Sequence, residues 1–336
     1  MRYLIPGLLM ALLIIALLAG MNGAFASGSA KNMDHEQDSL SLTPAGGGSQ
    51  TVKPSPIPSA TAAFTLVPSA TAVLPTKPSA TTEPSYTPTN APTNTPTLTP
   101  TPDAAAWKEW PVIPAIPVDM KAIYERGLAQ GTIDPQAFSV LGDCQSESGD
   151  FLGVFENNPE LVGTLPEGLQ ETVANFAGSF SRYNPAAKSG SSAGSLLYAA
   201  WNDNKEGTCL YGETPVDCEL RVHRPSIVFI HTGTHYETQE RNWYYLTIII
   251  DKILERGAVP VLVTKADNLE LDEHINQNMA KLAVKYGLPL WNFWSSVQDL
   301  PEHGLMPNRM HLTTAAHEVH RMGALEMLDA VWLAVR

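Results

Sequence analysis

The stretch AFSVLGDCQ, residues 137–145, joins a short apolar run to a polar turn that begins Gly142-Asp143-Cys144. The apolar part has the length and the residue types of a buried β-strand. Three later stretches share this character: SIVFIHT (226–232), VPVLVT (259–264) and LPLWNFW (288–294). These four runs predict strands of one sheet.

Helical patterns separate the later predicted strands and follow the last one. Apolar residues recur at helical spacing in four segments, which are residues 167–180, 244–257, 273–287 and 313–335. Alternating strands and helices are typical of a parallel sheet with helices on both faces, and right-handed crossovers restrict its topology. We therefore predict an α/β fold, a three-layer α/β/α sandwich, with ligands bound at the carboxyl ends of the strands.

The first 26 residues have the features of a secretory signal peptide. Arg2 precedes the apolar run LIPGLLMALLIIALLAG, and Ala24-Phe25-Ala26 provides a cleavage signature of small residues. An uncleaved membrane anchor is the alternative, because the run approaches the roughly 18 residues that span a bilayer. Either way, the chain is predicted to be exported to the cell surface or beyond.

Residues 27–104 form a low-complexity segment rich in Ser, Thr and Pro, in which PSATA recurs with a ten-residue period. Such a segment has too few large apolar side chains to offset the entropy of ordering. We interpret it as a disordered stalk or linker that attaches residues 105–336 to the cell envelope. Those residues are enough for one well-packed domain.

Net charge and cysteine content narrow the function further. The formal charge of −13 argues against nucleic acid as a partner. Three cysteines in an exported chain indicate one disulfide and one remaining cysteine. Cys209 and Cys218 bracket a short loop of turn-forming residues and are the natural pair, which leaves Cys144. A bridge from Cys144 to either of them is the alternative.

Polar residues follow the predicted strands where ligands are expected to bind. Gly142-Asp143-Cys144 follows the first strand, GTHY (233–236) follows the second, and Asn308 and His311 precede the last helix. A nucleophile, a histidine and a group that orients the histidine are the parts of covalent acyl transfer.

These motifs resemble those of the SGNH/GDSL hydrolases. VLGDC matches the family's Gly-Asp-Ser block, GTHY its Gly-x-Asn-Asp block, and NRMHLTTAAH its Asp-x-x-His block. Their order and spacing agree over nearly all of residues 105–336. The resemblance implies a mainly parallel, flavodoxin-like five-stranded sheet and ester hydrolysis that requires no cofactor.

Three residues depart from the family pattern. Cys144 replaces the nucleophilic serine, His235 the asparagine of the third block, and Asn308 the aspartate. The loss of that aspartate is severe for a serine, but a neutral asparagine can orient the histidine of a thiol enzyme. Cys144, His311 and Asn308 are therefore chemically consistent as a catalytic set. Degeneration of an ancestral site is the alternative.

The resemblance also implies an oxyanion hole. Its donors would be the backbone N–H groups of Cys144 and Gly194 and the imidazole N–H of His235, with Asp143 and Gly233 at the same substrate-binding edge. His235 has a second interpretation, as a packed polar residue after a tight glycine turn.

Two other motifs carry less weight. GSSAG (190–194) fits the Gly-x-Ser-x-Gly pattern of another hydrolase fold, but RYNPAAK before it is a poor strand, so Ser192 is a weak candidate nucleophile. His317 and His320 lack the spacing of zinc-protease histidines. We predict that they are surface or capping residues, and we expect no metal site.

The sequence thus predicts a secreted or surface-displayed esterase that cleaves acyl esters, including O-acetyl groups on extracellular polysaccharide, through Cys144. The substrate class rests on analogy with the family and on the surface location. The alternative is a catalytically inactive fold that serves as a surface binding or adhesion module.

Overall fold

The computed structural model describes residues 102–233 and 237–336. The predicted signal peptide and residues 27–101 of the predicted stalk lie outside these ranges, so both remain predictions, as does the domain boundary near residue 105. Among the helices of the two described ranges, none is both long enough and apolar enough to cross a membrane.

Four parallel strands form one sheet in the order β1-β2-β3-β4. They are β1 (Asp134–Gly142), β2 (Pro225–His231), β3 (Val259–Val263) and β4 (Leu290–Trp291). Every residue of β2 and β3 is buried, as expected for a sheet covered on both faces. Gly142 pairs with His231 at the carboxyl ends of the first two strands.

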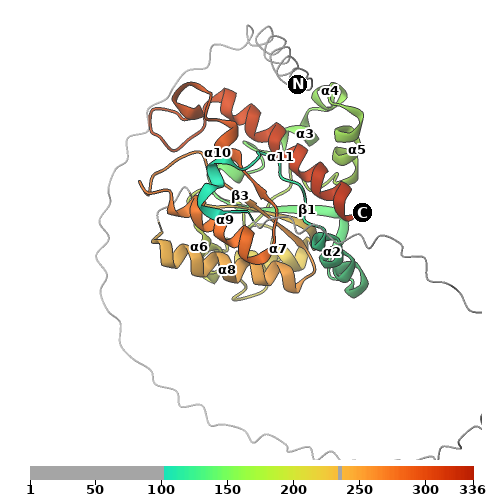
Figure 1. Cartoon of the computed structure of the whole chain (residues 1–336). Helices are drawn as coiled ribbons and strands as arrows, with labels where there is room; N and C mark the ends of the chain where they lie inside the picture. Colours follow the sequence, from blue (N-terminus) through green and yellow to red (C-terminus); the bar gives the residue numbers. More distant parts are fainter. Residues whose placement is uncertain (1–101, 234–236) are drawn as a thin grey trace, which may run out of the picture. The chain divides into compact units, whose positions relative to one another are not determined.

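Helices cover both faces of the sheet (Figure 1). One face carries α7 (Pro215–Val222), α8 (Gln239–Glu255) and α9 (His274–Tyr286). The other carries α11 (Thr314–Val335), which packs against α5 (Glu167–Asn175) and α2 (Asp119–Gln130). The shorter helical elements are η1 (Ala104–Glu109), η2 (Cys144–Ser146), α3 (Val154–Asn157), α4 (Pro159–Gly163), α6 (Ala193–Leu196), η3 (Ala199–Trp201), α10 (Phe293–Ser296) and η4 (Pro301–Gly304). The predicted three-layer α/β/α fold is confirmed.

The expectation of five strands needs correction, because the described residues contain four. A single parallel bridge between Gly142 and Ala187 occupies the outer side of β1. Pro185 has no N–H to donate to a ladder, and the Asn184 side chain instead donates to Val140 O at 2.7 Å and accepts from Ala186 N at 2.8 Å. Side-chain bonds thus replace the backbone ladder of a fifth strand.

The fourth strand is shorter than predicted. Residues 288–294 were expected to be extended, but only Leu290 and Trp291 pair with β3. Asn292 caps α10, since its Oδ1 accepts from Ser295 N at 3.4 Å, and Thr264 Oγ1 accepts from Trp294 N at 3.0 Å. These two bonds turn the chain into a helix directly after the strand.

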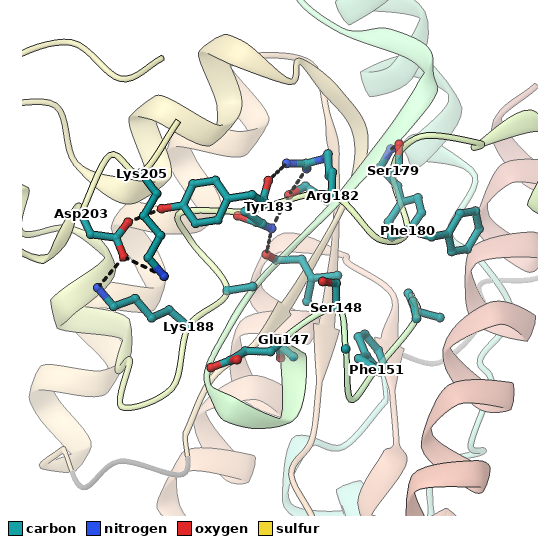
Figure 2. Close-up of a pocket in the computed structure, with 18 residues that line it drawn as sticks. Glu147, Ser148, Phe151, Ser179, Phe180, Arg182, Tyr183, Lys188, Asp203 and Lys205 are labelled. Carbon is teal, nitrogen blue, oxygen red and sulfur yellow. Dashed lines mark hydrogen bonds and ion pairs between the residues drawn. The ribbon is translucent and has the colours of Figure 1, made fainter. Parts of the chain in front are cut away.

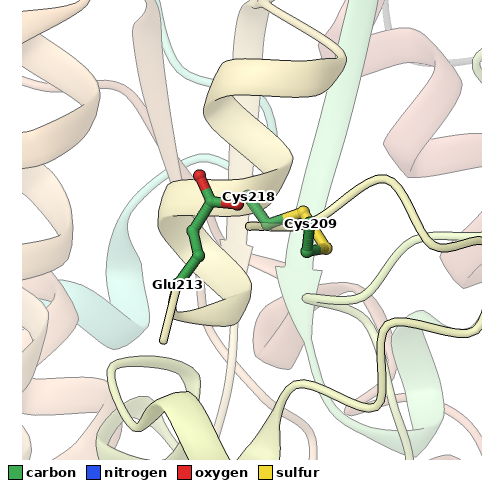
Figure 3. Close-up of side chains that lie close together, drawn as sticks. All are labelled: Cys209, Glu213 and Cys218. Atoms are coloured by element: carbon green, nitrogen blue, oxygen red, sulfur yellow. A yellow bond between two sulfur atoms is a disulfide. The ribbon is translucent and has the colours of Figure 1, made fainter. Parts of the chain in front are cut away.

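Cys209 and Cys218 form a disulfide, as predicted (Figure 3). A Glu213 carboxylate oxygen lies close to both sulfurs, in an arrangement that could otherwise hold a metal ion. Because the sulfurs are bonded to each other, neither is the thiolate that a metal ion requires. The disulfide ties the loop after η3 to α7.

Candidate active site

The turn that carries Cys144 depends on close backbone packing at Gly142. A Cβ atom at this position would lie 2.5 Å from His231 O and would also overlap the Ser146 side chain. Gly142 N donates to Ala186 O at 2.8 Å, which fixes the end of β1. Glycine is therefore required where the strand ends and the turn folds back over β2.

Asp143 is 2% exposed and caps the single helical turn η2. Its Oδ1 accepts from Gln145 N at 3.1 Å, and Cys144, the first residue of the turn, is half-buried. A carboxylate at this position acts as a structural cap for the turn of residues 142–146 that carries the candidate nucleophile, called the nucleophile turn below.

Gln145 joins the nucleophile turn to the loop that carries the candidate base. It is 3% exposed, and its Nε2 donates to Met310 O at 2.8 Å. The loop itself is closed by a bridge between Leu305 and Leu312. This hydrogen bond therefore joins two segments that are far apart in sequence. Cys144 precedes Gln145 in one segment, and His311 follows Met310 in the other.

Asn308 and His311 form the predicted pair. Asn308 Nδ2 lies 2.7 Å from His311 Nδ1, and both side chains are exposed. Asn308 Oδ1 accepts from the backbone N–H groups of Met310 and His311, each at 3.1 Å. Because an oxygen must face those two donors, the amide nitrogen faces the ring.

This orientation fixes the tautomer of His311. The amide N–H donates to Nδ1, so the neutral ring carries its proton on Nε2. A general base that accepts the proton of a nucleophile through Nε2 requires the opposite tautomer, with Nδ1–H donating to an acceptor. The described geometry therefore supports base catalysis only after the Asn308 amide rotates.

Gly233 lies two residues after the end of β2, at the predicted substrate-binding edge. Its φ of +139° favours glycine, and a Cβ atom would lie 2.8 Å from Ile275 Cγ2 and 2.9 Å from Lys265 Cδ. The prediction for His235 concerns a residue outside the described ranges and remains a prediction.

Gly194 lies near the start of α6, and its backbone N–H donates to Glu237 Oε1 at 2.8 Å. Asn242 Nδ2 holds the second carboxylate oxygen at 3.1 Å. The oxyanion role of Gly194 remains a prediction, and it requires Glu237 to release this N–H.

Ser192, the alternative nucleophile, is the N-cap of α6. Its Oγ accepts from Ser195 N at 3.2 Å, and Ser195 Oγ accepts from Ser192 N at 2.8 Å. This reciprocal capping accounts for the serine-rich motif. Among the described residues, no histidine or carboxylate bonds to Ser192 in the way that an activated serine needs.

A buried charged cluster near this edge was not assigned a role from the sequence. Lys265 Nζ lies 2.5 Å from Asp267 Oδ1 and 2.6 Å from Glu270 Oε2. Burial raises the pKa of Asp267, although Lys265 opposes this effect. The sequence did indicate charged residues at this strand end, because KADNLE follows an entirely apolar strand. The segment contains no motif, however, that indicates which charges pair.

A second unanticipated feature is the presence of two histidines, His231 and His320, in the aromatic core beneath the turn. Burial lowers the pKa of His231, whose Nδ1 lies 3.2 Å from Ser146 Oγ. His320 was predicted to lie at the surface or in a cap, and this was wrong, because it is fully buried and its ring centroid lies 4.2 Å from that of Phe151. Neither ring nitrogen of His320 has a hydrogen-bond partner within the described ranges.

Comparisons with known proteins give matches in structure only. No protein-family model matches the chain, and no curated protein matches its sequence. An esterase EstA from Pseudoalteromonas is 13% identical with a TM-score of 0.40, covering 57% of this chain and 96% of the esterase. A lipolytic G-D-S-L family protein from Veillonella parvula is 12% identical with a TM-score of 0.35, covering 56% and 96%.

A lipase/acylhydrolase from Enterococcus faecalis is 16% identical with a TM-score of 0.37, covering 57% of this chain and 93% of that protein. The chain is thus similar to structures of lipolytic GDSL proteins.

Proposed function

We propose that this chain is an exported ester hydrolase that forms an acyl-enzyme on Cys144. The observation that carries the proposal is the hydrogen bond from Gln145 Nε2 to Met310 O. It holds the nucleophile turn against the loop in which Asn308 contacts His311. This bond supports the proposal that Cys144, His311 and Asn308 act together at one edge of the sheet.

The proposed reaction has two steps. Cys144 Sγ attacks the ester carbonyl carbon while the thiol proton passes to His311 Nε2, and the imidazolium then protonates the departing alcohol oxygen. Water attacks the thioester in the second step, with the same ring as base and then as acid, and the carboxylic acid leaves. His311 can act in this way only when Asn308 presents Oδ1 to Nδ1–H.

The donors proposed for the oxyanion are the backbone N–H of Cys144 and, after release from Glu237, that of Gly194, together with His235. Acyl esters, including O-acetyl groups on extracellular polysaccharide, are the proposed substrates. The proposed location is the cell surface, with residues 27–104 as the stalk.

A catalytically inactive binding module is the second candidate, and a specific observation favours it. The Asn308 amide donates to His311 Nδ1, which is the wrong arrangement for a base. An inactive fold has no need of the correct tautomer.

Hydrolysis of p-nitrophenyl acetate decides between the two candidates. The thiol mechanism requires that Cys144→Ala and His311→Ala each lose nearly all activity, and that an alkylating agent inactivates the wild type by labelling Cys144. Ser192→Ala is the matched control and should retain activity. If the wild type hydrolyses neither this ester nor acetylated sugars, the binding module is correct. If Ser192→Ala is inactive and Cys144→Ala is active, the nucleophile has been misassigned.

A further inference from the structure

A cavity of about 180 Å³ lies beside the nucleophile turn (Figure 2). Ser146, two residues after Cys144, is part of its wall. Lys188 N donates to Gly142 O at 3.2 Å, so the opposite wall is attached to the same strand end. The charged and phenolic side chains of its lining are Glu147, Arg182, Tyr183, Lys188, Asp203 and Lys205.

One carboxylate organises the outer part of the cavity. Asp203 accepts a hydrogen bond from the Tyr183 hydroxyl, and its Oδ2 lies 3.3 Å from Lys188 Nζ and 3.5 Å from Lys205 Nζ. Burial, followed by the hydrogen bond to Asp203, raises the pKa of Tyr183, so its hydroxyl stays protonated. Lys188 Nζ also donates to Trp201 O at 3.3 Å. An ammonium group has three N–H donors, so Lys188 retains one for a ligand and Lys205 retains two.

The inner part of the cavity is electrically balanced. Arg182 pairs with the buried carboxylate of Glu219 and donates through Nε to His223 Nε2 at 2.9 Å. The remaining charged groups on the wall are two lysines and two carboxylates, Asp203 and Glu147. A lining with no net charge, and with both donors and acceptors, matches a neutral hydroxylated group. An anion would meet two carboxylates.

The size of the cavity limits what can enter it. Whole small-molecule ligands occupy pockets of about 300–1,000 Å³, whereas the volume of this cavity is about 180 Å³. The cavity therefore accommodates one ring-sized group of a larger molecule.

The outer wall is held in place before any ligand binds. Asn204 follows Asp203, and its side chain accepts from Cys209 N at 2.8 Å and donates to Cys209 O at 3.1 Å. Cys209 is in turn bonded to Cys218 of α7. A wall fixed in this way loses little conformational entropy on binding, which favours affinity.

We propose that this cavity binds a neutral, hydroxyl-rich group, such as one sugar unit, that carries the ester cleaved at Cys144. The ester part of the proposal rests on the proposed function, whereas the binding part does not. Hydroxyls of the bound unit donate to Asp203 and Glu147 and accept from Lys188 and Lys205.

Binding is tested on the full exported chain with Cys144→Ala, by saturation-transfer NMR with methyl glucoside and with glucuronate. Transfer to methyl glucoside that falls at least about threefold with Asp203→Asn or Lys205→Met, and not with Lys281→Met, supports the proposal. Lys281 is exposed on α9 and outside the cavity. Absence of transfer to methyl glucoside, stronger transfer to glucuronate, or equal transfer in all variants overturns it.

Kinetics then test the link to the ester. The ratio of kcat/KM for an acetylated methyl glucoside to that for p-nitrophenyl acetate should fall about tenfold in Lys205→Met, as expected when one hydrogen bond to a charged group is lost. Lys281→Met should leave the ratio unchanged. An unchanged ratio in Lys205→Met refutes the cavity as the site for the sugar of the ester. If neither ester is hydrolysed, the proposed function fails, and the NMR result alone decides the binding proposal.

Discussion

Replacement of Asn308 with aspartate tests the geometry of the site most directly. Asn308 Oδ1 accepts two backbone N–H bonds at 3.1 Å, and Nδ2 donates to His311 Nδ1. An aspartate keeps both backbone bonds through one oxygen and offers the other to Nδ1–H. The substitution should therefore place the ring in the tautomer that a base requires, without any rotation of the side chain.

The size of the gain follows from the bonds that rotation of the amide would break. Each is worth about 0.5–1.5 kcal/mol, so the pair costs about 1–3 kcal/mol. At 1.36 kcal/mol for each factor of ten, this is roughly 5- to 150-fold in rate. Because both side chains are exposed, the charge of the aspartate is screened by solvent and should add little.

The assay is kcat for p-nitrophenyl acetate between pH 6 and 8, with the melting temperature as a check on folding. Asn157→Asp, at the exposed end of α3, adds the same charge elsewhere and should leave kcat unchanged. Asn308→Asp with an unaltered melting temperature and no gain in kcat would falsify the proposed tautomer. The gain should be larger in a Cys144→Ser background, because a hydroxyl depends more strongly on its base than a thiol does.

Three further predictions concern the chain as a whole. Without reductant, peptide maps should recover Cys209 linked to Cys218; recovery of Cys144 in a disulfide would exclude the thiol mechanism. Limited proteolysis should release a compact fragment that starts between about residues 103 and 115, and first cleavage within 119–336 would show that the domain boundary is misplaced. His320→Phe should raise the melting temperature by about 2–4 °C, because it removes two buried ring nitrogens that lack partners within the described ranges. Burial lowers the pKa of His320 well below 6.5, so stability is lost as the pH falls below 6.5; the variant should lose less, and an equal loss would contradict this explanation.

The layers of the fold were predictable because they depend on patterns that the sequence carries locally. The runs at 226–232 and 259–264 are short, apolar and β-branched, and both became strands within one residue of the expected ends. The fourth strand was overestimated because Asn292 and Thr264, which are distant in sequence, combine to start α10. Tertiary hydrogen bonds, which no local pattern records, set that boundary.

Burial of polar groups was harder to predict. His320 occupies a helical position whose neighbours alternate between polar and apolar, so the pattern allowed either face. His320 lies on the buried face of the helix because its ring packs against Phe151 and Trp291. The sequence around Lys265 likewise did not indicate that Asp267 and Glu270 would pair with its ammonium group.

The pair Asn308 and His311 shows which part of the proposed site a motif cannot predict. The sequence supplied the residue types at positions 308 and 311 and the expectation that they touch, and they do. It did not supply the direction of their hydrogen bond, because that direction depends on which amide atom faces the N–H groups of Met310 and His311. A carboxylate has two equivalent oxygens and satisfies the backbone and the ring together. An amide at the same position has only one acceptor oxygen, and in this fold that oxygen accepts from the backbone N–H groups, so the amide nitrogen faces the ring. An asparagine therefore differs from an aspartate at this position in more than charge, since it reverses the donor and the acceptor at the ring of the proposed base.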